Sequence, residues 1–274
     1  MRLKTLLGDY PVTQALKSGR ITSNLVQFDY ADVKPPHAGF KRLVRDLEFD
    51  VAEIAIVTFL MAKAYGKPYR LLPAVMFGRF QHPYLVSVRG LSPKELEGKR
   101  VAIRSSSVTT VAWLRGILAD DYGVDLSRVR WVTFEDAHVA EFRDPPGTER
   151  APAGKTALNM LLDGEVDAAV LADPVPKDGR LKPVIPDPAA AAQDWHRRKG
   201  AIQVNHMVCV KSSLPQDIVD EVYRMLVESK KLGARDSPTC PFGLEANRRH
   251  LEVAIDYVFR QGLIPKRYAV DELF

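Results

Sequence analysis

The chain of 274 residues contains little cysteine and no long apolar run. Its two cysteines are Cys209, which lies in an apolar run, and Cys240, which lies in a proline-flanked loop, and together they suggest no disulfide framework. The most apolar stretch, 51–62, is interrupted by Glu53 and is shorter than the about 20 apolar residues that a membrane-spanning helix needs. The first ten residues lack the apolar core and cleavage site of a signal peptide. We therefore expect a cytoplasmic protein.

Several common motifs are also absent from the sequence. It contains no phosphate-binding loop, no glycine-rich dinucleotide fingerprint, no zinc-protease helix motif and no serine-hydrolase elbow. The net charge of +5 is spread along the chain and is not gathered into a basic arm, which argues against a nucleic-acid partner. A mild attraction for small anions is consistent with that charge, and a hydrophobic content of 46% is enough for a substantial core.

What is present is an alternation of strand-like and helix-like segments. An apolar run at 3–7 leads through a short loop into a helix with a proline in its first turn, and similar units recur along the chain. This alternation predicts an α/β protein with mixed, mostly parallel sheets flanked by helices. We place the chain crossings near 84–89 and 200–210. The expected lobes are therefore 1–84 plus 205–274, which is discontinuous, and 85–204, with a cleft between them.

Ligands of open α/β sheets bind beyond the carboxyl ends of the strands, so the residues at those ends are candidates for a site. Glu53 breaks an apolar run, and its burial would be costly unless it lies at a strand end in the cleft or pairs with a cation at the sheet edge. His206 interrupts the returning strand at 204–210, and it is either a ligand-binding residue or a satisfied core histidine.

A hydroxyl-rich segment between a predicted strand and a helix is a candidate anion site. A helix start offers free backbone N–H groups and the positive end of the helix dipole, although a single serine that caps the helix would explain the segment equally well. Two arginines near strand ends are suited to hold carboxylates. The candidate anion-binding residues are Ser105, Ser106, Ser107, Thr109, Thr110, Arg79 and Arg104.

Two histidines near strand ends are candidates for proton transfer near neutral pH. His82 follows a strand near the first chain crossing, and His138 lies in a cluster with Glu135 after another strand. The alternatives are a structural histidine and a solvated carboxylate. Together with His206 these groups are also candidates for a divalent metal site, but they lack a local ligand signature, so we expect neither a metal nor a cofactor.

Four segments carry a resemblance to a known family. They are Phe49-Asp50-Val51-Ala52-Glu53, Gly78-Arg79-Phe80-Gln81-His82, Trp113-Leu114-Arg115-Gly116-Ile117-Leu118 and Gly262-Leu263-Ile264-Pro265. In this order they resemble the 4,5-dihydroxyphthalate decarboxylase family, which the Asp9-Tyr10 pair and the position of His206 also fit. The resemblance implies the two-lobed fold of type II periplasmic solute-binding proteins, a cytoplasmic enzyme of phthalate degradation and no firmly required cofactor.

The resemblance implies a decarboxylase of a hydroxylated aromatic dicarboxylate that works by acid-base catalysis in the interlobe cleft. We expect His82 and His138 to transfer protons, without deciding which is the acid, and Glu135 and Glu53 to orient or replace them. Asp9, Tyr10 and His206 join the anion-binding residues in holding a small aromatic carboxylate. The alternatives are a non-catalytic solute-binding protein for a small anionic metabolite and another cofactor-free enzyme of the same fold. A homo-oligomer is left open, and no membrane partner is expected.

Overall fold

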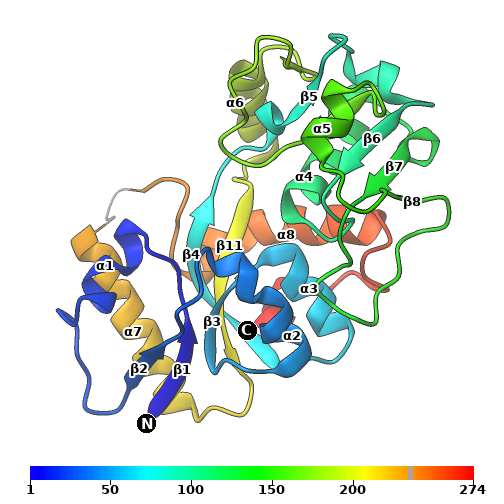
Figure 1. The fold of residues 1–274 in the computed structure, drawn as a ribbon. Coiled ribbons are helices and arrows are strands. Elements are labelled where there is room, and N and C mark those ends of the chain that lie inside the picture. The colour runs from blue at the N-terminus through cyan, green and yellow to red at the C-terminus, as the bar shows by residue number, and fades with distance from the viewer. Residues whose placement is uncertain (234–236) are drawn as a thin grey trace. The chain divides into compact units, whose positions relative to one another are not determined.

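A computed structural model describes residues 1–233 and 237–274 and divides them into two compact units (Figure 1). The first unit contains Met1–Arg79, Ile202–Asp256 and Ile264–Phe274, and the second contains Phe80–Ala201 and Tyr257–Leu263. The first crossing thus comes at Arg79 and the return at Ile202. No local sequence signal indicates that Tyr257–Leu263, which contains the last turn of the final long helix and the residues directly after it, counts with the second unit.

The first unit is built on a five-stranded sheet with the order β2-β1-β3-β11-β4. Strands β2 and β3 run parallel to β1, whereas β11 runs antiparallel to both β3 and β4, so the sheet is mixed. Its strands are β1 (Arg2–Leu6), β2 (Gln27–Tyr30), β3 (Val51–Ala55), β4 (Tyr69–Gly78) and β11 (Val204–Lys211). Its helices are α1 (Pro11–Lys17), α2 (Phe40–Asp46), α3 (Ile56–Ala64), α7 (Gln216–Gly233) and most of α8 (Leu244–Arg260).

The central strand β3 determines where the core of the first unit lies. All of its residues are buried, as expected of a strand that is covered on both faces. Its run continues directly into α3, whose residues Ile56 to Ala62 are buried as well. In Figure 1 the yellow strand β11 lies beside β3, so a late segment of the chain completes the sheet that the first residues begin.

The second unit has a six-stranded sheet with the order β10-β5-β9-β6-β7-β8. Strand β6 is parallel to β7 and β9, and β5 is antiparallel to β9 and β10. The strands are β5 (Leu85–Ser87), β6 (Arg100–Ile103), β7 (Arg130–Thr133), β8 (Glu149–Arg150), β9 (Ala168–Val170) and β10 (Lys182–Pro183). The helices are α4 (Thr109–Tyr122), α5 (Ala157–Leu162) and α6 (Pro188–Lys199).

Short 3₁₀ helices complete the inventory of both units. They lie at Pro36–Gly39, His82–Tyr84, Pro93–Leu96, Leu126–Arg128 and Val270–Leu273. In the ranges that the structure describes, none of the helices has both the length and the apolar character needed to span a bilayer.

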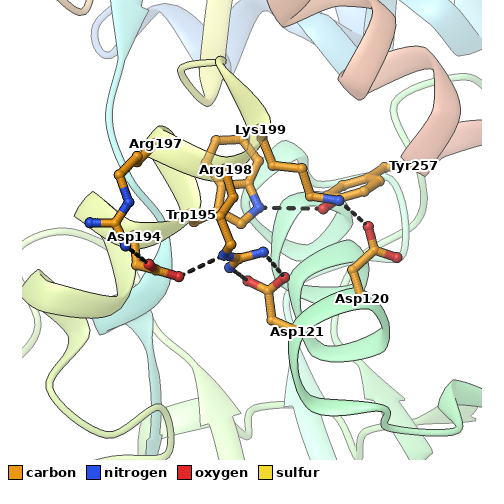
Figure 2. A network of polar contacts seen from close by, with 8 residues as sticks. All are labelled: Asp120, Asp121, Asp194, Trp195, Arg197, Arg198, Lys199 and Tyr257. Carbon is orange, nitrogen blue, oxygen red and sulfur yellow. Dashed lines mark hydrogen bonds and ion pairs between the residues drawn. The ribbon is translucent and has the colours of Figure 1, made fainter.

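Ion pairs join the last turns of α4 and α6 in the second unit (Figure 2). Asp121 binds Arg198 at 2.8 Å, and Asp120 binds Lys199 at 2.6 Å. Arg260 of α8 also reaches Asp120, at 2.8 Å. Two carboxylates at the C-terminal end of α4 are repelled by the negative end of the helix dipole. Their pairing with Arg198, Lys199 and Arg260 offsets this repulsion. These exposed pairs fix the relative placement of the helix ends more than they add stability.

Tyr257 belongs to the second unit because its ring fills a space there. It packs edge-on against Trp113 with the ring centroids 5.6 Å apart, and its hydroxyl accepts a hydrogen bond from the indole of Trp195 at 3.4 Å (Figure 2). The backbone of α4 leaves room for this ring only because residue 116 is glycine, since a Cβ there would lie 1.9 Å from Tyr257 Cδ2. The sequence Trp113-Leu114-Arg115-Gly116 is thus shaped by the contact with α8.

We expect Gly116→Ala to destabilise the protein by about 1–3 kcal/mol, although alanine is the better helix former, because the added methyl collides with the Tyr257 ring. Urea unfolding measures the change. Gly179→Ala is the matched control, since no described atom lies within 4 Å of the methyl that it adds. A Gly116→Ala protein as stable as the parent contradicts the packing described here.

Candidate functional site

Glu53 is a fully buried carboxylate at the centre of the first unit. It accepts hydrogen bonds from the backbone N–H of Gly8 at 3.0 Å, from the hydroxyl of Tyr10 at 2.7 Å and from Nδ1 of His206 at 2.5 Å. A buried carboxylate is tolerated when donors replace its hydration, and these three donors do so. The sequence left open a strand-end position in the cleft or an ion pair at the sheet edge; among the described residues, the donors to Glu53 are Gly8, Tyr10 and His206, with no lysine or arginine among them.

The sheet brings these donors together from distant parts of the chain. His206 lies opposite Ala55 in the β3–β11 ladder, so its side chain is on the same face as Glu53, two residues earlier. Gly8 and Tyr10 belong to the loop that follows β1, the parallel neighbour of β3. The carboxyl end of β1, the start of α1 and the returning strand therefore meet at one carboxylate.

The Tyr10 hydroxyl is a permanent donor in this cluster. Burial raises the pKa of Tyr10 far above its ordinary value, and the negative charge of Glu53 raises it further. The phenol therefore stays protonated at any pH at which the protein functions. Its proton is directed to Glu53 Oε1, the oxygen that also receives His206.

His206 is oriented by this carboxylate. Because a carboxylate only accepts, the proton of the 2.5 Å contact belongs to His206 Nδ1, and Nε2 is the nitrogen left to exchange a proton with another molecule. The rings of Phe40 and Phe77 flank the imidazole, with centroids at 5.3 Å and 5.6 Å. Its side chain is 16% exposed, so the ring is held firmly and is still accessible.

Aromatic and cationic groups adjoin the histidine. The rings of Tyr10 and Phe77 are parallel within 2°, with centroids 6.4 Å apart. The guanidinium of Arg79, the residue directly after β4, lies over the ring of Phe77, 5.3 Å from the ring centroid. A flat, apolar surface with a cation beside it is suited to an aromatic carboxylate.

A second polar cluster lies in the second unit, where the hydroxyl-rich segment precedes α4. The N-cap residue is Val108 and no side chain caps the helix, so the alternative that a single serine caps it does not hold. Ser105 and Ser107 contact each other through their hydroxyls at 3.2 Å. The Ser106 hydroxyl and Arg104 Nε are buried without a hydrogen-bond partner among the described residues. Uncapped helix N–H groups next to such atoms favour an anion site.

The remaining residues of this candidate site are near the same strand ends. Thr109 and Thr110 are buried in the first turn of α4. The carbonyl of Arg104 accepts the backbone N–H of Glu135 at 2.9 Å, so the carboxyl ends of β6 and β7 are tied together there. Glu135 itself is exposed, whereas His138, three residues later, is buried. The proton-transfer roles predicted for Glu135 and His138 stay predictions.

The surroundings of His82 do not suit the role predicted for it. Its side chain is fully buried and packs near Phe80 and Trp195, with ring centroids 6.5 Å and 6.4 Å away. Neither ring nitrogen has a hydrogen-bond partner among the described residues. Burial lowers the pKa of His82 to about 4, so the ring is neutral near pH 7. His82 is a packing residue of the second unit, and we no longer assign it proton transfer.

Asp9, which is expected to hold substrate, is paired within the protein. Its carboxylate pairs with Lys17 and with Lys34, the latter at 2.8 Å. Hydrogen bonds from these two lysines lower the pKa of Asp9 to about 2. A carboxylate has no donor to offer a carboxylate ligand, and this one is already engaged by two lysines, so the substrate-binding role of Asp9 stays a prediction.

The described ranges contain no group of three or more His, Cys, Asp or Glu side chains arranged to hold a metal ion. The expectation that no metal and no cofactor is required stays a prediction.

Comparison with curated proteins identifies relatives with one activity in common. The chain is 29% identical over 236 residues to a 4,5-dihydroxyphthalate decarboxylase of Comamonas testosteroni, which covers 79% of this chain and 70% of that protein. It is 29% identical over 217 residues to a 4,5-dihydroxyphthalate decarboxylase of Pseudomonas putida, which covers 72% of this chain and 82% of that protein. The resemblance that the four sequence segments indicate is therefore confirmed. No protein-family model matches the chain.

Solved structures confirm the expected fold class. The alkanesulfonate-binding protein SsuA from Xanthomonas axonopodis pv. citri superimposes with a TM-score of 0.57, at 16% identity, over 99% of this chain and 97% of that chain. The periplasmic aliphatic sulphonate binding protein SsuA from Escherichia coli gives 0.53, at 13% identity, over 100% and 91%. The chain therefore has the fold of the periplasmic solute-binding proteins.

The surroundings of His82 predict a pH effect on stability. A folded-state pKa of about 4 lies below the ordinary value of about 6.5, so the unfolded chain binds the extra proton between these values. Stability is complete above pH 6.5 and falls as the pH drops toward 4, with a slope of at most about 1.4 kcal/mol per pH unit from this group.

We expect His82→Phe to remove that part of the slope and to leave ligand binding unchanged, as measured by urea unfolding at a series of pH values and by calorimetry. His37→Gln, at an exposed position, is the control and keeps the slope of the parent. A slope that survives in His82→Phe places the titration elsewhere.

Proposed function

We propose that this protein decarboxylates a hydroxylated aromatic dicarboxylate of the 4,5-dihydroxyphthalate type, with His206 as the group that exchanges a proton with the substrate. The relatives named for this reaction support the reaction class. The observation that carries the assignment of His206 is the buried carboxylate of Glu53, which fixes Nδ1 of the ring and leaves Nε2 available.

The chemistry requires proton transfer at two places on the substrate. A base removes the proton from the ring hydroxyl para to the departing carboxylate, which raises the electron density at the carbon that bears that carboxylate, and the same base returns the proton to the hydroxyl after carbon dioxide has left. This carbon then takes up a proton, the carbon–carbon bond breaks, its electron pair returns to the ring, and carbon dioxide leaves. One proton is consumed for each carboxylate converted to carbon dioxide, so an acid must be renewed in every cycle.

The Glu53–His206 pair has the properties that such an acid needs. The buried carboxylate accepts the Nδ1 proton of the ring and holds the imidazole in one orientation, so that protons are exchanged at Nε2. The imidazolium donates its Nε2 proton to the ring carbon and is reprotonated from solvent, which the 16% exposure of the side chain permits. Gly8 and Tyr10 hold Glu53 in place through the cycle.

Each unit also offers groups that suit the carboxylates of the substrate. In the first unit these are the Arg79 guanidinium and the faces of Phe77 and Tyr10. In the second unit they are the uncapped start of α4 and the Ser106 hydroxyl. We propose that Arg79 binds a carboxylate of the substrate; the anion-binding roles expected of Arg104 and residues 105–110 stay predictions. The cytoplasmic location and any homo-oligomeric state stay predictions.

We expect His206→Gln and Glu53→Gln to lower the rate of carbon dioxide release from 4,5-dihydroxyphthalate about 10²- to 10⁴-fold, since a general acid typically contributes that much, while the dissociation constant changes little. Carbon dioxide is measured by a coupled assay and affinity by calorimetry. The matched controls are His37→Gln and Glu48→Gln, which make the same chemical changes outside the cluster. A parent protein that binds the diacid and releases no carbon dioxide, with or without a divalent metal, is instead a solute-binding protein.

We expect Arg79→Gln to weaken binding of the diacid by about 1.5–3 kcal/mol, the usual contribution of a hydrogen bond to a charged group, and to change the turnover of bound substrate less. Calorimetry with the His206→Gln background separates binding from reaction. Arg89→Gln, which removes a half-exposed arginine paired with Asp167, is the control. Equal affinities of Arg79→Gln and the parent exclude Arg79 from the binding site.

A further inference from the structure

The loop that holds Glu53 is itself held from one side by helix α1. Thr13 is fully buried on this short helix, and its hydroxyl donates to the carbonyl of Gly8 at 2.6 Å. The hydroxyl oxygen of Thr13 also accepts a hydrogen bond from the backbone N–H of Tyr10 at 3.1 Å. A single side chain therefore fixes the residue before Asp9 and the residue after it.

Lys17, one helical turn beyond Thr13, holds the preceding peptide. Its ammonium donates to the carbonyl of Leu7 at 3.0 Å. That carbonyl belongs to the same peptide group as the N–H of Gly8, which donates to Glu53. A cation on the carbonyl polarises the peptide and strengthens its N–H as a donor. Residues four apart lie on one face of a helix, so Thr13 and Lys17 act on the loop together.

Close packing leaves the loop no other arrangement at Gly8. A Cβ at residue 8 would lie 2.5 Å from Tyr10 Cε2 and 2.8 Å from Pro36 Cγ. The Tyr10 ring thus lies directly against the backbone of Gly8, and the two donors to Glu53 move as one piece. A displacement of this piece changes both hydrogen bonds to the carboxylate that orients His206.

We infer that Thr13 is a positioning residue for the Glu53–His206 pair: by binding the Gly8 carbonyl and the Tyr10 N–H, it sets the two donors that fix Glu53. The inference rests on the proposed function for its catalytic consequence, although its structural consequence is independent of any activity. Thr13 does not touch the substrate. It acts through Gly8, Tyr10 and Glu53, as the residues behind a metal ligand or a catalytic base do.

The test compares Thr13→Val, which keeps the shape and removes the hydroxyl, with Thr13→Ser, which keeps the hydroxyl. We expect Thr13→Val to lower kcat for 4,5-dihydroxyphthalate about tenfold, as the loss of one positioning hydrogen bond does, to change KM less and to move the pH profile of kcat. Thr13→Ser restores most of kcat. Thr5→Val is the matched control, because Thr5 is equally buried and its hydroxyl, within the part of the chain that the structure describes, binds the carbonyl of Leu3 and no member of the Glu53 cluster.

A second variant keeps the test valid if Thr13→Val unfolds. Lys17→Met preserves the apolar stem of a partly exposed side chain and removes the ammonium from Leu7, and we expect it to lower kcat in the same way. Urea unfolding confirms that each assayed variant is folded.

The amide proton resonance of Gly8 is a readout that needs no activity. We expect Thr13→Val to shift it toward the position of a weaker hydrogen bond, while Thr5→Val leaves it unchanged. If the parent releases no carbon dioxide but this shift is seen, the proposed function fails and the positioning of Glu53 stands. If Thr13→Val keeps the parent kcat, pH profile and Gly8 resonance, the inference is overturned.

Discussion

The burial of one carboxylate is the constraint on which the first unit depends. Glu53 lies in the middle strand of a sheet and has no exposed surface, so its charge must be balanced by donors from its neighbours. One donor is a backbone N–H, one is a phenol and one is an imidazole. These donors come from the loop after β1, the start of α1 and strand β11, so all three must be in place. The result is an imidazole whose Nδ1 is held by Glu53 and whose Nε2 can exchange a proton with a ligand.

The sequence indicated Glu53 and His206 separately but not their contact. Each polar residue interrupts an apolar run, and that signal is local and easily read. The pairing of β11 between β3 and β4 is set by packing across about 150 residues of intervening chain, which no local pattern encodes. The chemistry of the cluster follows from that pairing, so the functional pair appears only in the folded chain.

The surroundings of His82 and Asp9 that the sequence did not indicate share one physical cause. His82 follows a strand end, as a catalytic histidine often does, but its ring is enclosed by Trp195 from a helix far along the chain. Asp9 stands in a loop at a strand end, but Lys17 and Lys34 neutralise it. Trp195 comes from a distant part of the chain, and Lys17 and Lys34 reach Asp9 only when α1 and the segment after β2 are in place, so the fold and not the local sequence sets these contacts. The hydroxyl-rich segment does precede a helix, as predicted, because a helix start is a local feature, and its anion-binding role stays a prediction.

The late position of Tyr257–Leu263 in the sequence affects how the second unit folds during synthesis. Tyr257–Leu263 completes the packing of the second unit, although the rest of that unit ends at Ala201. During synthesis, residues 80–201 emerge long before Tyr257 does, so Trp113 and Trp195 lack this aromatic neighbour until Tyr257 has left the ribosome. Exchange of the second unit between relatives must therefore include Tyr257–Leu263, or the recipient will carry a gap beside Gly116.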